Sequence, residues 1–92
     1  MIDQQRSIGF VCLANYCRSP VAKVLLENKF KNSLKVDSAG IDPMISAGMD
    51  PRSVNYLKEN NYAYEIHSPK KINKVFLKSS DIVFAMDAYI LM

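Results

Sequence analysis

Apolar runs and helical patterns alternate along this chain. A mostly apolar run at 7–11 and a run of alternating apolar and polar residues at 34–38 flank a stretch at 20–31 in which apolar residues recur every three to four positions. Short runs of this kind are typical of strands, and the longer period is typical of a helix. The first forty residues are therefore predicted to form a strand, a helix and a second strand.

The next predicted element is a helix with clear start and stop signals. It spans 51–60, with Asp50 as the N-cap and Pro51 at the first helical position. Asn60 and Asn61 are expected to end it, because asparagine tolerates the backbone conformations found at helix ends.

Two further elements are predicted toward the end of the chain. A short helix at 70–78 places Ile72, Val75 and Phe76 on one face, and an apolar run at 82–86 predicts a strand. Because strands alternate with helices, we expect a parallel sheet of the α/β class. Since that last run is almost without polar residues, its strand is expected to be covered on both faces.

The composition fits one globular domain over residues 1–92. The chain is 49% hydrophobic and 23% charged, with a formal net charge of +3 and only two cysteines. No apolar run approaches the roughly 18 residues of a membrane-spanning helix, and the polar N-terminus is too short for a signal peptide. We therefore expect a cytoplasmic protein with no membrane partner.

Four lysines gather around the short predicted helix: Lys70, Lys71, Lys74 and Lys78. With so small a net charge we interpret them as a solvated face, so no nucleic-acid partner is expected. Their long-range attraction would still favour the approach of a dianionic substrate, to an extent that salt reduces.

The loop between the first strand and the first helix carries the candidate chemistry. It reads Cys12-Leu13-Ala14-Asn15-Tyr16-Cys17-Arg18-Ser19-Pro20. A tight loop that opens a helix aims several backbone N–H groups and the positive end of the helix dipole at one point, where an oxyanion binds. Cys12 is placed to be a thiolate nucleophile, and Arg18 to bind two phosphoryl oxygens with its planar fork. The sequence therefore predicts a phosphate-binding loop.

Neighbouring residues are expected to shape this loop. Asn15 is expected to adopt a left-handed backbone conformation and not to react. Ser19 is placed either to cap the helix or to donate a hydrogen bond to the Cys12 sulfur, and Pro20 suits the first helical position.

Two polar residues follow predicted strands and are expected near the loop. Ser38 and Asp87 fall at or just after strand ends, and in open parallel sheets ligands bind outside those ends. Asp87 is interpreted as a residue that caps or orients its neighbours, and it is the fallback candidate within this chain for a general acid.

The loop is similar to the active-site signature of the low-molecular-weight protein tyrosine phosphatases, over residues 11–20 (VCLANYCRSP). The resemblance continues in Asp37-Ser38-Ala39-Gly40, in Asp50-Pro51-Arg52-Ser53, in His67 with the basic residues after it, and in 81–87. It covers nearly the whole chain. It implies a three-layer αβα fold around a central parallel sheet, with the flavodoxin-like strand order 2-1-3.

The resemblance also implies a reaction. Cys12 would attack phosphorus to form a cysteinyl-phosphate, Arg18 would bind the phosphoryl oxygens and Ser19 would stabilise the thiolate. Three residues match positions that support the loop through hydrogen bonds: Asn15, Ser38 and His67. The implied substrate is a tyrosine-phosphorylated protein or a small aryl phosphate. No cofactor is implied, and inorganic phosphate or sulfate is expected to occupy the loop.

One departure from the family concerns the general acid. In the family it is an aspartate followed by proline, beyond the point where this chain stops at Met92. We therefore expect a phosphatase-like domain that is incomplete at its C-terminus and lacks the fourth strand. Both turnover and phosphate or phosphotyrosine binding without turnover remain open.

A thiol-dependent arsenate reductase is the weaker alternative. Such an enzyme needs further cysteines to relay a disulfide, and none follows Cys17. Sugar-phosphotransferase components with a phosphocysteine do not require an arginine at the spacing of Arg18, so that residue favours the phosphatase.

Two loop residues have two interpretations each. Cys17 could form a reversible disulfide with Cys12 under oxidation, or be a buried spectator. The 41–49 loop resembles the family's variable substrate-rim loop, where an aromatic residue usually flanks the substrate ring, but it carries Met44 and Ile45 instead. Tyr16 could supply that ring, or it could pack against the adjacent helix. Because His67 is the only histidine and both cysteines lie in one loop, no metal site is expected.

Overall fold

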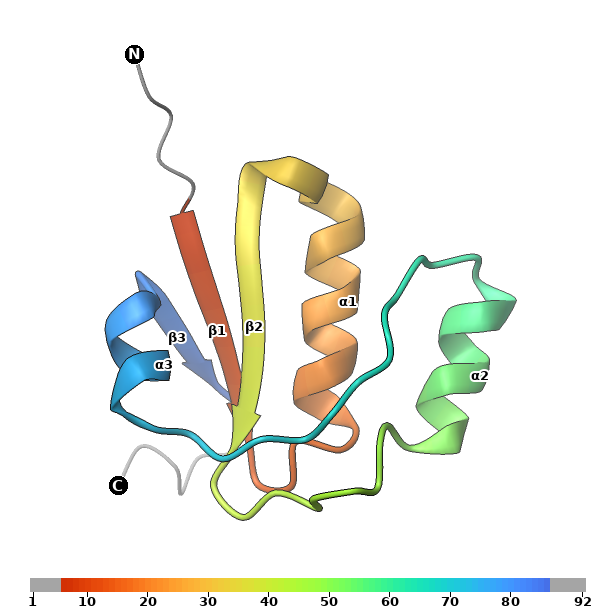
Figure 1. Cartoon of the computed structure of the whole chain (residues 1–92). Coiled ribbons are helices and arrows are strands. Elements are labelled where there is room, and N and C mark those ends of the chain that lie inside the picture. The colour runs from red at the N-terminus through yellow and green to blue at the C-terminus, as the bar shows by residue number, and fades with distance from the viewer. Residues whose placement is uncertain (1–5, 87–92) are drawn as a thin grey trace.

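The computed structural model describes residues 6–86, apart from the side chain of Asn32. Three strands form one parallel sheet in the order β2-β1-β3, which confirms the predicted α/β class and strand order (Figure 1). No helix in this part of the chain is long and apolar enough to cross a membrane. The elements are β1 (Arg6–Cys12), α1 (Arg18–Phe30), a 3₁₀ turn η1 (Lys31–Ser33), β2 (Leu34–Gly40), α2 (Pro51–Glu59), α3 (Lys74–Ser79) and β3 (Ile82–Ala85).

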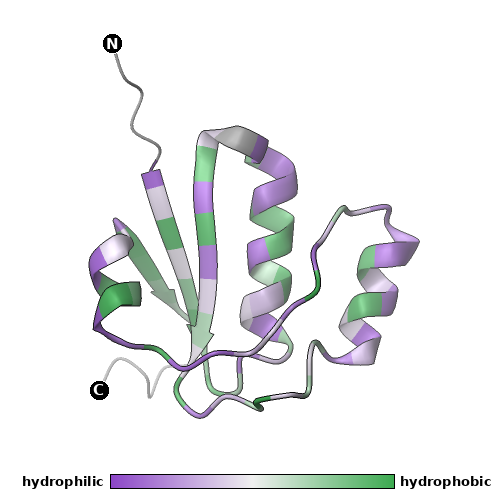
Figure 2. Cartoon of the chain, viewed as in Figure 1, coloured by the Kyte–Doolittle hydropathy of each residue, from purple (hydrophilic) through white to green (hydrophobic). Residues whose placement is uncertain are grey.

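Helices cover both faces of the sheet. α1 lies on one side and α3 on the other, and α2 lies beyond α1 (Figure 1). On the α3 side, Phe76 packs against Val11 and Ala39 of the two longer strands. Between α1 and α2, Val24 packs with Leu57. Both of these helices carry hydrophobic and hydrophilic residues, as helices with one buried face require (Figure 2).

The start signals of the two longer helices were predicted with different success. Asp50 caps α2 as predicted, since its carboxylate accepts a hydrogen bond from the backbone N–H of Arg52 at 2.9 Å. Helix α1 begins at Arg18, two residues before the predicted start, so Pro20 is its third residue. Its N-cap is Cys17, whose side chain makes no capping hydrogen bond, so capping is not the one of the two predicted roles that Ser19 takes.

The helix predicted at 70–78 begins later than expected. The side chain of Asn73 accepts a hydrogen bond from the backbone N–H of Phe76 at 2.8 Å, and this cap fixes the start of α3 at Lys74. Ile72 instead lies in an extended segment beside Gly40 and reaches the core from there. Val75 is 73% exposed, so its predicted place on the apolar face is wrong.

The last strand is less covered than its apolar sequence predicts. β3 lies at an edge of the sheet and pairs with β1 within the described residues. Its Ile82, Val83 and Phe84 are 52%, 36% and 48% exposed. The prediction of cover on both faces is wrong for this part of the chain, because α1 packs over β2 and β1 and α3 packs over β1.

Candidate active site

The phosphate-binding loop predicted from the sequence lies at the carboxyl edge of the sheet, between β1 and α1 (Figure 1). Cys12 pairs with Gly40 at the end of β2. On the other side of β1, the backbone N–H of Met86, just after β3, donates to the carbonyl of Val11 at 2.7 Å. The loop therefore leaves the sheet where the ends of three parallel strands meet, which is the position where open α/β sheets bind ligands.

The carbonyl groups of this loop point outward. The carbonyls of residues 12, 13 and 14 accept hydrogen bonds from the backbone N–H groups of Ile41, Asp42 and Met44 at 3.1, 2.8 and 3.0 Å, respectively. The carbonyl of residue 15 accepts from Nε2 of His67 at 2.6 Å, and that of residue 16 from the backbone N–H of Asp50 at 2.9 Å. Among the described residues, none of the amides of 13–17 donates to a protein acceptor. Because the C=O and N–H of a trans peptide point in opposite directions, these amides face the inside of the loop. Such a concave set of N–H groups binds an anion.

Cys12 lies at the base of this loop and is 2% exposed. Its Sγ is 2.9 Å from the hydroxyl of Ser19, which comes from the first turn of α1. The contact is the second of the two roles considered for Ser19 from the sequence. A hydroxyl at this distance can donate a hydrogen bond to a thiolate. The Cys12 sulfur also lies beside the N-terminus of α1, whose dipole favours negative charge.

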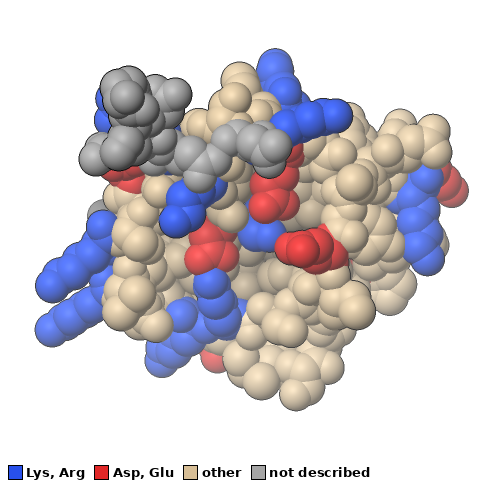
Figure 3. Space-filling view, turned by 45° about the horizontal axis from the view of Figure 1, so that its top comes forward, with Lys and Arg blue, Asp and Glu red and all other residues tan. Residues whose placement is uncertain are grey.

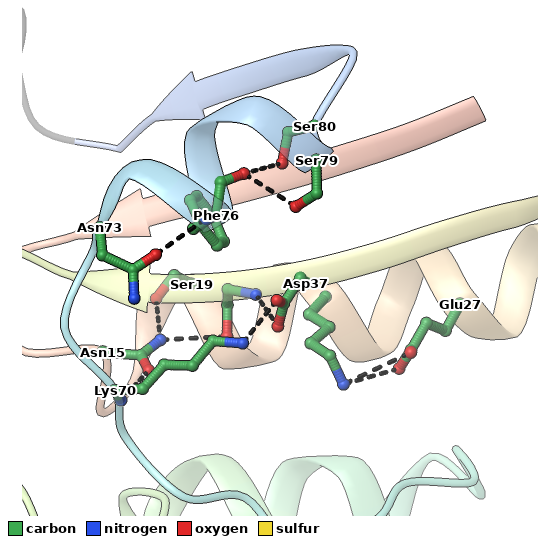
Figure 4. Close-up of polar contacts among 11 residues, drawn as sticks. Asn15, Ser19, Glu27, Asp37, Lys70, Asn73, Phe76, Ser79 and Ser80 are labelled. Atoms are coloured by element: carbon green, nitrogen blue, oxygen red, sulfur yellow. Dashed lines mark hydrogen bonds and ion pairs between the residues drawn. The ribbon is translucent and has the colours of Figure 1, made fainter.

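Asn15 connects the loop to three other segments. Its backbone is left-handed, with φ of 50°, as its position predicted. The side-chain Nδ2 donates to the hydroxyls of Ser19 at 2.8 Å and Ser38 at 3.0 Å, and Oδ1 accepts from the backbone N–H of Lys70 at 2.9 Å (Figure 4). The side chain is fully buried. Its polar atoms are therefore satisfied by protein groups that also fix the shape of the loop.

Replacing Asn15 by alanine is expected to lower the free energy of unfolding by about 2 to 3 kcal/mol, because it leaves the Lys70 N–H without its acceptor and puts a Cβ-bearing, non-bonding residue at positive φ. Asn15→Gly is the matched variant, since glycine removes the hydrogen bonds but tolerates the backbone conformation. Urea denaturation should rank the parent above Asn15→Gly and that variant above Asn15→Ala. Equal stability of the parent and Asn15→Ala would contradict the role given to this side chain.

His67 forms a hydrogen bond with a carbonyl group of the loop. Its Nε2 lies 2.6 Å from the carbonyl oxygen of Asn15. Since a carbonyl oxygen can only accept, Nε2 carries the hydrogen of this bond. Burial lowers the pKa of His67, and the positive charges of Lys23 and Lys70 lower it further, against the effect of the hydrogen bond to Asn15.

The lowered pKa of His67 predicts that the folded chain loses stability as the pH falls below about 6.5. In that range the unfolded chain takes up a proton on this histidine more readily than the folded chain does. We expect the melting temperature to fall between pH 7.5 and pH 5, and to fall less in His67→Gln, whose amide can still donate to the Asn15 carbonyl. An equal fall in both proteins would show that another group causes it.

Gly40 and the segment after it were not identified as site residues from the sequence. A Cβ at Gly40 would lie 2.9 Å from the backbone nitrogen of Asn15 and from the carbonyl oxygen of Leu13, so only glycine fits against the loop here. The amides of Ile41, Asp42 and Met44 then hold three loop carbonyls. Backbone N–H donors cannot be recognised from residue type, whereas Gly40, two residues after the predicted strand end, was a detectable signal.

Arg18 and Cys17 line an open groove of about 640 Å³ between α1 and α2, which Tyr56 and Met86 also border. Arg18 is exposed, as is Leu13. Asp87, predicted near the loop, lies outside the described residues. The structure thus brings together the loop, Ser19, Ser38 and His67, and leaves the position of Asp87 open.

Both cysteines are free thiols with different partners. Cys12 Sγ contacts Ser19, whereas Cys17 Sγ lies 3.1 Å from the hydroxyl of Ser53 in α2. Cys17 is only partly buried, so the interpretation as a buried spectator does not describe it.

Charges of both signs share the molecular surface. Lys70, one of the four clustered lysines, is paired with Asp37, and its Nζ lies 5.9 Å from the ring centroid of Phe76. On the face drawn in Figure 3, acidic side chains lie between the lysines and arginines. This mixture on that face fits the interpretation of a solvated surface.

Comparison with known proteins places the chain among phosphatases of one kind. Residues 7–91 match the family described as "Low molecular weight phosphotyrosine protein phosphatase". A curated relative from Escherichia coli K12, "Low molecular weight protein-tyrosine-phosphatase Wzb", is 32% identical over 81 residues, which cover 88% of this chain and 54% of the relative. The chain therefore spans about half the length of that relative.

Solved structures show the same fold. An arginine phosphatase, YwlE from Geobacillus stearothermophilus, superposes with a TM-score of 0.84 at 32% identity, over 92% of this chain and 55% of its own. A thioredoxin-dependent arsenate reductase from Corynebacterium glutamicum superposes with a TM-score of 0.82 at 27% identity, over 88% of this chain and 42% of its own. The fold is therefore shared by proteins whose names state different substrates.

Proposed function

Because the chain belongs to the low molecular weight phosphotyrosine protein phosphatase family, we propose that it hydrolyses aryl phosphate monoesters, phosphotyrosine above all, through a cysteinyl-phosphate intermediate. The observation that carries the proposal is the orientation of the loop: its carbonyls are held from outside and its amides face the inside, above a buried cysteine. Such a site offers an anion both hydrogen-bond donors and a nucleophile.

The proposed reaction has two displacements at phosphorus. The Cys12 thiolate attacks phosphorus, the bond from phosphorus to the aryl oxygen breaks, and the leaving group takes a proton. Water then attacks phosphorus, the sulfur–phosphorus bond breaks, and inorganic phosphate leaves with the thiolate restored. The loop amides and the Arg18 fork stabilise the charge on the equatorial oxygens in both steps.

The leaving group needs a proton when its bond to phosphorus breaks. General acid catalysis contributes about 100-fold to 10,000-fold, and most for leaving groups that are poor, such as tyrosine. Asp87 remains the candidate acid within this chain. A substrate with an activated leaving group, p-nitrophenyl phosphate, needs this acid least and is therefore the better first substrate.

The test is steady-state hydrolysis of three phosphate compounds by the folded chain, with circular dichroism as the control for folding. We expect turnover of p-nitrophenyl phosphate, slower turnover of phosphotyrosine and the slowest of phosphoarginine, with inorganic phosphate as a competitive inhibitor. A preference for phosphoarginine would refute the substrate class. Arsenate reduction in the presence of thiol, without phosphate release, would refute the reaction.

The second candidate is a module that binds phosphate or phosphotyrosine without turnover. The inward amides favour it, since they bind an anion whether or not a leaving group can be protonated. A folded chain that binds phosphate, or sulfate as its stand-in, and hydrolyses none of the three compounds would establish this function.

A further inference from the structure

The N-terminus of α2 contacts the end of the phosphate-binding loop at two points. The backbone N–H of Asp50 donates to the carbonyl of Tyr16 at 2.9 Å, and the hydroxyl of Ser53 lies 3.1 Å from Cys17 Sγ. Asp50 and Ser53 are both buried. Since Tyr16 and Cys17 directly precede Arg18, α2 fixes the part of the loop from which the arginine starts.

The position of Cys17 makes the contact with Ser53 more than local packing. Cys17 is the N-cap residue of α1, where a side chain usually bonds to the first turn of the helix, yet its sulfur makes no such bond. The sulfur is instead directed to α2, 36 residues farther along the chain. Cys17 therefore joins the start of α1 to the start of α2.

Ser53 contacts the loop through its side chain. Asp50, Ile41, Asp42 and Met44 hold the loop through backbone amides, which most substitutions would leave in place. The hydroxyl of Ser53 disappears with a single substitution, and the N-cap of α2 at Asp50 does not depend on it. Its effect can therefore be isolated by mutation.

We propose that Ser53 is a positioning residue for the phosphate pocket: through Cys17 it fixes the end of the loop so that the amide of Cys17 and the side chain of Arg18 are directed at the bound anion. This inference rests on the proposed function, because it concerns the same pocket. Loss of the hydroxyl leaves Cys17 free to move and costs the pocket part of its preorganisation.

The experiment measures binding of inorganic phosphate by titration calorimetry in the Cys12→Ser background, where binding is separated from turnover. Ser53→Ala should weaken phosphate binding by about 2-fold to 13-fold, which corresponds to the roughly 0.5–1.5 kcal/mol that one hydrogen bond contributes. Threonine keeps the hydroxyl and valine has the same shape without it. Ser53→Thr should therefore bind close to the parent, and Ser53→Val should match Ser53→Ala. Asn55→Ala, exposed on the same helix, is the control and should bind as the parent does.

The outcomes distinguish failure of the role of Ser53 from failure of the proposed function. If the parent binds phosphate and the alanine and valine variants bind it equally well, the role of Ser53 is refuted and the proposed function stands. If none of the folded proteins binds phosphate, the proposed function fails and the role of Ser53 fails with it. If Ser53→Ala does not fold, the threonine and valine pair decides, because those two variants differ only in the hydroxyl.

Discussion

Replacing Cys12 by serine is expected to lower the rate of p-nitrophenyl phosphate hydrolysis by about 10,000-fold or more. A serine hydroxyl is a far weaker nucleophile than a thiolate unless a base removes its proton. Among residues 6–86, the side chain that lies within hydrogen-bond distance of this sulfur is that of Ser19, 2.9 Å away, and a hydroxyl is not such a base. Phosphate binding should persist in the variant, because the loop amides are unchanged.

Cys17→Ser is the informative comparison for this prediction. It removes the other of the two cysteines, whose sulfur contacts Ser53 and lies beside an open groove. If Cys12 is the nucleophile, the rate of p-nitrophenyl phosphate hydrolysis should fall by about tenfold at most in Cys17→Ser. The two results that would rule out Cys12 as the nucleophile are equal losses of activity in the two variants, and a Cys12→Ser protein as active as the parent. The assay is run at a temperature at which all three proteins are folded.

The secondary structure was predictable where a local signal sets it. Asp50 and Pro51 define the start of α2 in the sequence and in the structure, because an N-cap and a proline act on their own turn. The start of α3 carried such a signal too, in Asn73, but the lysines before it fitted a helical pattern equally well. The exposure of β3 had no local signal, since it depends on which helices reach the edge of the sheet.

The site divides in the same way between side chains and main chain. Asn15 has a residue type that its conformation favours, so its left-handed backbone could be predicted from the sequence. The donors from Ile41, Asp42 and Met44 could not, because every residue except proline has an amide to offer. The contact between Ser53 and Cys17 joins residues far apart in sequence, and pairing of this kind follows only from the fold.

Replacing Arg18 by lysine is expected to lower kcat/KM for p-nitrophenyl phosphate by about 1,000-fold, although the positive charge is kept. Arginine binds two oxygens of one phosphoryl group with a planar fork, whereas lysine offers a single point of charge. Because the charge on the equatorial oxygens redistributes and these oxygens change position in the transition state, the loss should fall mainly on kcat. The affinity for inorganic phosphate should fall less.

The matched control for Arg18→Lys is Arg52→Lys, the same exchange at an arginine close to the loop. Arg52 is bound to Asp50 and its side chain is 90% exposed, so its lysine variant should keep kcat/KM within about twofold. A small effect at both positions would mean that positive charge near the loop suffices and that no fork is needed. A large effect at position 18 alone would assign the phosphoryl oxygens to Arg18, because the charge and the exchange are the same at both positions and only the place relative to the loop differs.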